Sequence, residues 1–141
     1  MMQPQSTLLV FEDQLDDILE KLKTKTIRMA SSRSEPWNPL REGKEISLDS
    51  SGKFVLPDPE AGISLASSLG QLQRIWRTGR KNYLFTIDRN TRLEDGFAFN
   101  EESIGHWMII VTKKMTVEEF ESKVKRMAQT WKLMGRYIKN A

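Results

Sequence analysis

The apolar positions of the chain divide into stretches with helical spacing and stretches with strand spacing. Near the N-terminus, leucines and one isoleucine recur every three or four positions among acidic residues, which predicts an amphipathic helix over residues 6–23. A second helix is expected to start at Ser67 or Ser68 and to end at Gly79, because glycine readily takes the left-handed conformation that follows a helix. Each helix is expected to lay one face against a core.

The C-terminal part carries the clearest helix-start signal. Thr116 followed three residues later by Glu119 matches a capping box, in which the two side chains satisfy the first backbone N–H groups of a helix. Apolar residues then recur at steps of three or four: Val117, Phe120, Val124, Met127, Trp131, Met134 and Ile138. This spacing predicts one helix over residues 116–138.

Shorter apolar or alternating segments predict strands. They are Lys25–Ala30, residues 53–56, Gly62–Ala66, residues 82–87, residues 97–99 and residues 107–112. The polar segment over residues 31–48 predicts a long loop, and loops of that length often carry functional sites. The pattern as a whole predicts an α+β fold, with a compact mixed or antiparallel sheet and flanking helices in one domain over residues 1–141.

Composition narrows the chemistry. The 141 residues include no cysteine and one histidine, which excludes disulfides and the usual zinc sites, so we expect no metal. No apolar run reaches the roughly 18 to 20 residues of a membrane span, and carboxylates follow the N-terminus too soon for a secretory signal. We therefore expect a protein that acts in the cytoplasm without a membrane.

The net charge of the chain is only +3, but residues 74–92 form a basic cluster that contains a single acid, Asp88. Its members are Arg74, Arg77, Arg80, Lys81, Arg89 and Arg92. Such a cluster could meet an anion, and it favours one alternative, a small basic RNA-binding or ribonuclease-type toxin of a toxin–antitoxin pair. Solvated surface charge is the more common role of such residues. A non-enzymatic interaction domain is a further alternative.

Four polar residues are candidates for chemistry. His106 is the one side chain whose ordinary titration lies near neutrality, although a lone histidine at a strand end is more often a structural donor. Ser64 lacks a glycine-x-serine-x-glycine pattern, which disfavours a hydrolase. Arg28 stands in an apolar strand, where its charge needs either a bound anion or an exposed edge. Glu102 precedes His106 closely enough to share a loop with it.

Four segments, in their order and separation, resemble the type VI secretion exported effector "two" toxins, which have relatives encoded in many fungal genomes. The segments are TIRMA, GKFVLPDPEAGIS, NYLFTIDRNTRLEDGFAF and GHWMIIVTKKMTVEEF, and together they span about residues 27–126. The resemblance implies an ADP-ribosyltransferase-like fold and a growth-inhibiting toxin that transfers ADP-ribose from NAD to a macromolecule. It also implies that a cognate immunity protein or antitoxin neutralises the toxin.

The resemblance also assigns roles to individual residues. Arg28 would meet the dinucleotide phosphates, and Gly62 would allow the backbone to approach the nicotinamide ribose. Ser64 would hydrogen-bond or brace that strand, and His106 would orient a ribose hydroxyl or the acceptor. Transferases of this kind place a glutamate against the ribose. No position here matches that motif cleanly, and Glu102 is the candidate because it lies near His106 in the sequence.

Overall fold

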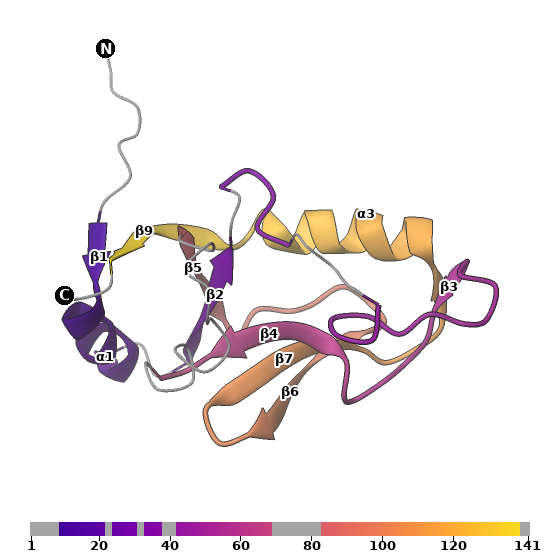
Figure 1. Cartoon of the computed structure of the whole chain (residues 1–141), viewed down its shortest axis with the longest axis horizontal. Coiled ribbons are helices and arrows are strands. Elements are labelled where there is room, and N and C mark those ends of the chain that lie inside the picture. Colours follow the sequence, from indigo (N-terminus) through magenta and orange to yellow (C-terminus); the bar gives the residue numbers. More distant parts are fainter. Residues whose placement is uncertain (1–8, 22–23, 31–32, 38–41, 69–82, 139–141) are drawn as a thin grey trace, which may run out of the picture.

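A seven-stranded sheet forms the body of the protein in a computed structural model that describes residues 9–21, 24–30, 33–37, 42–68 and 83–138. The strands run in the order β1-β9-β5-β2-β4-β7-β6, and β3 and β8 form a separate pair (Figure 1). The strands are β1 (Leu9–Phe11), β2 (Lys25–Ala30), β3 (Phe54–Val55), β4 (Gly62–Ala66), β5 (Tyr83–Asp88), β6 (Phe97–Ser103), β7 (His106–Val111), β8 (Met115–Thr116) and β9 (Lys132–Ile138). Because β1 pairs with β9 in parallel and the other described pairs are antiparallel, the fold is α+β with a mostly antiparallel sheet.

The two described helices, α1 (Glu12–Lys21) and α3 (Val117–Ala128), contribute to apolar clusters on opposite faces of the sheet. Successive residues of a strand point to opposite faces. Leu65 accordingly packs in the cluster that contains Phe120 and Val124 of α3, whereas its neighbour Ala66 packs in the cluster that contains Leu19 of α1. We call these faces the α3 face and the α1 face.

The sheet is weakly joined between β2 and β4. One residue pair, Ile27 and Ala66, aligns these strands, whereas β2 pairs with β5 along its whole length. Both strands match the predicted bounds, Lys25–Ala30 and Gly62–Ala66. The other four predicted strands correspond to β3, β5, β6 and β7, with ends that differ by at most four residues.

The predicted C-terminal helix is correct at its start and wrong at its end. Thr116 caps α3 by accepting a hydrogen bond from the backbone N–H of Glu119 at 3.1 Å, but the helix stops at Ala128. Residues Lys132–Ile138 form β9 instead. Gly135 has a φ of 154°, a conformation that no helix contains, and β9 is bulged beside it where it pairs with β5. Trp131, Met134 and Ile138 thus share helical spacing without sharing a helix.

The predicted N-terminal helix is also shorter than expected. Residues Leu9–Phe11 form β1, so the helix begins at Glu12, where the acidic residues begin. The helix predicted to run from Ser67 or Ser68 to Gly79 lies from residue 69 onward outside the part of the chain that the structure describes. Within the described residues no helix has the length and apolarity needed to cross a membrane.

Candidate functional site

The pairing of β4 with β7 brings Ser64 and His106 together on the α1 face of the sheet. Ser64 lies opposite Met108, and Ala66 lies opposite His106, so the serine and the histidine are diagonal neighbours. The histidine Nε2 lies 3.4 Å from the serine Oγ. This distance is longer than an ordinary hydrogen bond, as is common in catalytic pairs without substrate.

Glu102 reaches His106 because β6 is irregular. Glu101 pairs with Trp107 and Ser103 pairs with His106, so Glu102 is an extra residue on β6. Such a bulge can redirect a side chain. The Glu102 Oε2 lies 2.9 Å from the His106 Nδ1, and Gly105, with a φ of 81°, makes the turn between the two strands. The three side chains therefore form a chain of contacts, which we call the Ser64–His106–Glu102 relay.

The protonation state of Glu102 determines which way a proton can move along the relay. Hydrogen bonding to His106, and then to Ser103, lowers the pKa of Glu102 below its usual value, so its carboxylate is ionised near neutral pH and only accepts hydrogen bonds. The tautomer of His106 that donates from Nδ1 to this carboxylate would have Nε2 as an acceptor toward Ser64. The relay can withdraw a proton from Ser64 or from a group bound beside it.

The relay lies in a hollow of about 330 Å³. Its described lining residues are Lys44, Glu45, Glu60, Ser64, Glu102, His106 and Met108. Three are glutamates and one is a lysine, so carboxyl groups outnumber the single ammonium group around the relay. An environment of this kind favours a reacting group that gains positive charge.

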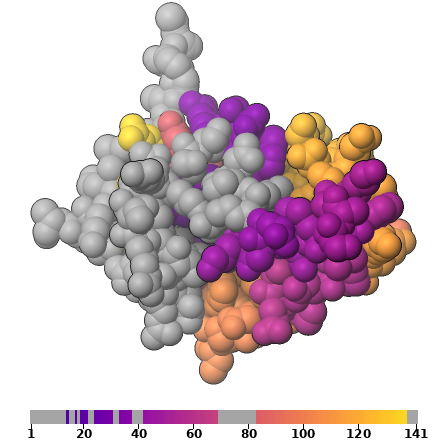
Figure 2. Space-filling model, turned by 45° about the vertical axis from the view of Figure 1, so that its right-hand side comes forward, coloured from indigo at the N-terminus to yellow at the C-terminus, as the bar shows by residue number. Residues whose placement is uncertain are grey.

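Two loop segments form the rim of this hollow. The backbone N–H of Gly62 donates to the carbonyl of Lys44 at 3.3 Å, which holds residues 42–48 beside the start of β4. The side-chain amide of Asn100 donates to the carbonyl of Pro59 at 3.2 Å, which ties the 57–60 turn to β6. In Figure 2 the purple-to-magenta segment that includes both loops lies between gold α3 and the orange β6–β7 hairpin.

Arg28 does not line the hollow as the structure describes it. Its side chain is buried on the α3 face, opposite the Ser64 side chain, because Ile27 and Ala66 pair on the α1 face. The Arg28 Nε donates to the carbonyl of Pro36 at 3.2 Å, and Nη1 donates to the carbonyl of Ser64 at 3.3 Å. The guanidinium thus links β2 to β4 where the strands diverge.

The space that a side chain at Gly62 would fill is already taken by residues of β7. A Cβ atom at this position would lie 2.7 Å from the backbone oxygen of Ile109 and 2.9 Å from the Met108 Cβ. Glycine is needed here because β7 approaches β4 closely. The structure therefore brings together Ser64, His106 and Glu102, and it places Arg28 and Gly62 in the framework behind them.

Four residues that line the hollow were not among the predicted site residues: Lys44, Glu45, Glu60 and Met108. The first two lie in the loop that was expected to carry a site, but charged loop residues are too common to single out. Met108 follows His106 by two positions, so it shares the same face of β7. Its place beside Ser64 follows from the pairing of β4 with β7, which local sequence does not reveal.

The basic cluster is only partly described. Arg74, Arg77, Arg80 and Lys81 lie outside the described residues, and the Arg89 guanidinium stacks on the Trp107 ring at 4.3 Å. In the part of the chain that is described, no group of three or more His, Asp or Glu side chains could hold a metal ion.

Comparison with protein-family models, curated proteins and solved structures finds no match to this chain.

Proposed function

We propose that this chain is a growth-inhibiting toxin that cleaves the bond between nicotinamide and ribose in NAD and transfers ADP-ribose to a cellular macromolecule. One observation carries the proposal: the Ser64–His106–Glu102 relay lies in a hollow where carboxyl groups outnumber the one ammonium. The order of the four sequence segments supports the same function, and the α+β fold with a mostly antiparallel sheet is compatible with it.

The charge of the hollow separates this reaction from its alternatives. Loss of nicotinamide leaves positive charge on the ribose, which nearby carboxylates stabilise. Acyl transfer builds an oxyanion and RNA cleavage builds negative charge on the reacting phosphate, and Glu45, Glu60 and Glu102 would oppose both. The diphosphate of NAD does not react and would lie outside the hollow. The balance of charge in the hollow therefore favours transfer of a glycosyl group.

Each member of the relay has a role under this proposal. Glu102 would stabilise the positive charge on the ribose and fix the tautomer of His106. The Nε2 of His106 would take the proton of the acceptor as the acceptor attacks. Ser64 would hydrogen-bond a ribose hydroxyl. A hollow of about 330 Å³ is at the small end for ligand cavities, so it would hold the reacting nicotinamide riboside end of NAD.

The test is incubation of the purified protein with NAD labelled in its adenylate half, with and without a cell lysate. Release of nicotinamide and labelling of a macromolecule are expected. Glu102→Gln should lower the rate by about a hundredfold or more, as loss of a group that stabilises transition-state charge usually does. Ser64→Ala should lower the rate less, by roughly tenfold, because it removes one hydrogen bond.

Matched controls use exposed residues of α3 that lie outside the hollow. Glu121→Gln changes the net charge in the same way as Glu102→Gln, and Ser122→Ala removes a hydroxyl as Ser64→Ala does. Both controls should retain wild-type rates and should still arrest growth when expressed. If Glu102→Gln and Glu121→Gln cleave NAD equally well, the proposal is wrong.

The relay geometry also fits a second candidate, serine-dependent acyl transfer, because a serine, histidine and carboxylate in this order form the familiar nucleophilic triad. A fluorophosphonate probe distinguishes the two. Labelling at Ser64 that requires His106 would identify a nucleophilic serine. Absence of labelling in protein that consumes NAD would exclude the acyl-transfer reaction.

A further inference from the structure

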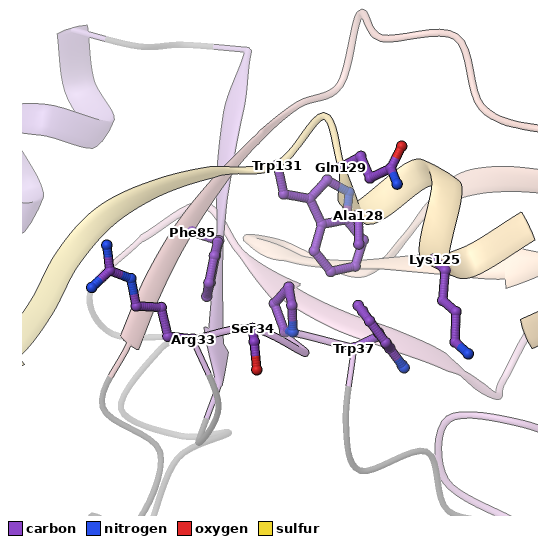
Figure 3. Close-up of a pocket in the computed structure, with 9 residues that line it drawn as sticks. Arg33, Ser34, Trp37, Phe85, Lys125, Ala128, Gln129 and Trp131 are labelled. Carbon is purple, nitrogen blue, oxygen red and sulfur yellow. The ribbon is translucent and has the colours of Figure 1, made fainter. Parts of the chain in front are cut away.

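A second pocket, of about 370 Å³, lies on the α3 face of the sheet, between the end of α3 and the loop that follows β2 (Figure 3). Its described lining residues are Arg33, Ser34, Pro36, Trp37, Phe85, Lys125, Ala128, Gln129 and Trp131. We call it the tryptophan pocket. It shares no described lining residue with the hollow around Ser64, and its volume suits a small ligand.

The lining is aromatic inside and cationic at the rim. Phe85 and Trp131 are 4% and 6% exposed, whereas Arg33 and Lys125 are exposed. Figure 3 shows Arg33 and Lys125 on opposite sides of the group of rings. Among the described lining residues there is no carboxyl side chain, so the charge of this pocket is opposite in sign to that of the hollow.

The apolar floor is fixed before any ligand binds. Phe85, Trp131 and Ala128 belong to the buried cluster on the α3 face, and Trp37 packs against that cluster. The position of Pro36 is fixed by a hydrogen bond, which its carbonyl accepts from the buried Arg28 Nε. Because these aromatic side chains are already fixed, little conformational entropy is lost from the protein when a flat ring stacks on them.

We propose that the tryptophan pocket binds a planar aromatic ring that carries an anionic group, of which a purine nucleoside monophosphate is the representative. The ring would stack on Trp37, which is half-buried, whereas Trp131 in the same pocket is buried. The anion would lie toward Lys125, and the exposed Gln129 amide, one helical turn further along, would hydrogen-bond a ring edge. This inference does not depend on the reaction proposed for the relay.

Adenosine 5′-monophosphate is the probe, and the indole N–H signals of the tryptophans report where it binds in an NMR titration. The signals of Trp37 and Trp131 should shift on titration. The signal of Trp107, which does not line the pocket, should move much less. Adenosine, which lacks the charge, and inorganic phosphate, which lacks the ring, should each bind more weakly.

Variants test the two parts of the pocket separately. Trp37→Leu keeps apolar bulk against the core but removes the stacking surface, and it should weaken binding of the monophosphate by about tenfold. Lys125→Gln removes one exposed cation and should weaken it by roughly twofold to fivefold. Lys21→Gln, an exposed position on α1 with the same change in net charge, should have no effect.

Several results would overturn the proposal. It fails if the monophosphate leaves both Trp37 and Trp131 signals unmoved, if adenosine binds equally well, or if Lys125→Gln and Lys21→Gln behave alike. Ser64→Ala should leave this binding unchanged, because the pocket and the hollow lie on opposite faces of the sheet. Loss of NAD cleavage and loss of monophosphate binding can therefore be told apart.

Discussion

The relay depends on single residues that let β4, β6 and β7 approach closely. Gly62 lets the backbone of β7 lie against β4, and the extra residue Glu102 turns a carboxylate toward His106. Gly62 lies against residues of β7 and Glu102 contacts His106, so both lie away from the side chains that α3 buries. Small changes at these residues should therefore alter the site while the rest of the sheet remains formed.

Gly62→Ala should lower the free energy of unfolding by about 1 to 3 kcal/mol, because the new methyl group would meet the Ile109 carbonyl at 2.7 Å and one strand must shift. Urea unfolding followed by far-UV circular dichroism measures the loss. Ser122→Ala, at an exposed helix position, should leave the midpoint unchanged. An unchanged stability with a raised KM for NAD would instead mean that Gly62 makes room for ligand.

At the scale of elements, α3 is the helix whose start is fixed by a specific side chain. The Thr116 hydroxyl accepts the N–H of Glu119, and Glu118 and Glu119 place negative charge at the helix N-terminus. Phe120 and Val124 of the same helix are buried against the sheet. The cap therefore sets where the helix that covers the α3 face begins.

Thr116→Ala should cost about 1 kcal/mol of stability, the usual value of an N-cap side chain. Thr116→Ser keeps the hydroxyl and should recover most of that loss in the same chemical denaturation series. A destabilisation of Thr116→Ser equal to that of Thr116→Ala would show that the methyl group, and not the hydrogen bond, matters at this position.

The start of α3 and the interiors of most strands were predictable from the sequence, whereas the start of α1, the end of α3 and the strands β1 and β9 were not. Lys25–Ala30 and Gly62–Ala66 alternate or run apolar between polar segments, and the capping box marks the start of α3. The end of α3 was missed because Met134 and Ile138 continue the helical spacing past Gly135. In the structure, pairing of β9 with β5 and β1 outweighs that spacing.

Three of the residues that line the hollow, Ser64, His106 and Glu102, were predictable from the sequence, but their arrangement was not. Ser64 and His106 stand out by residue type, but their contact depends on the register of β4 against β7, which lies outside local sequence. Glu102 was chosen for its nearness to His106 in sequence, and the bulge supplies the geometry. The Arg28 guanidinium donates to two backbone carbonyls, an arrangement that residue type alone does not distinguish from binding of a phosphate.

At the scale of the whole molecule, the sheet consists of two parts that meet at β2 and β4. The strands β1, β9, β5 and β2 form one part, and β4, β7 and β6 form the other. One aligned residue pair and the guanidinium of Arg28 connect the two strands, and the buried apolar clusters on both faces also span the boundary. The relay lies wholly in the second part, so the join determines how firmly the site is held against the rest of the fold.

Arg28→Lys tests this join, because lysine keeps the charge but cannot reach two carbonyls with a planar fork of donors. The free energy of unfolding should fall by about 3 kcal/mol, since bonds from a buried charged donor are lost. Amide hydrogen exchange should rise in β4 more than in β5, which keeps its full pairing with β2. Arg92→Lys, at an exposed position, provides the control. Unchanged stability and exchange, combined with a raised KM for NAD, would make Arg28 a ligand-binding residue and would require the two parts of the sheet to be held together by other contacts.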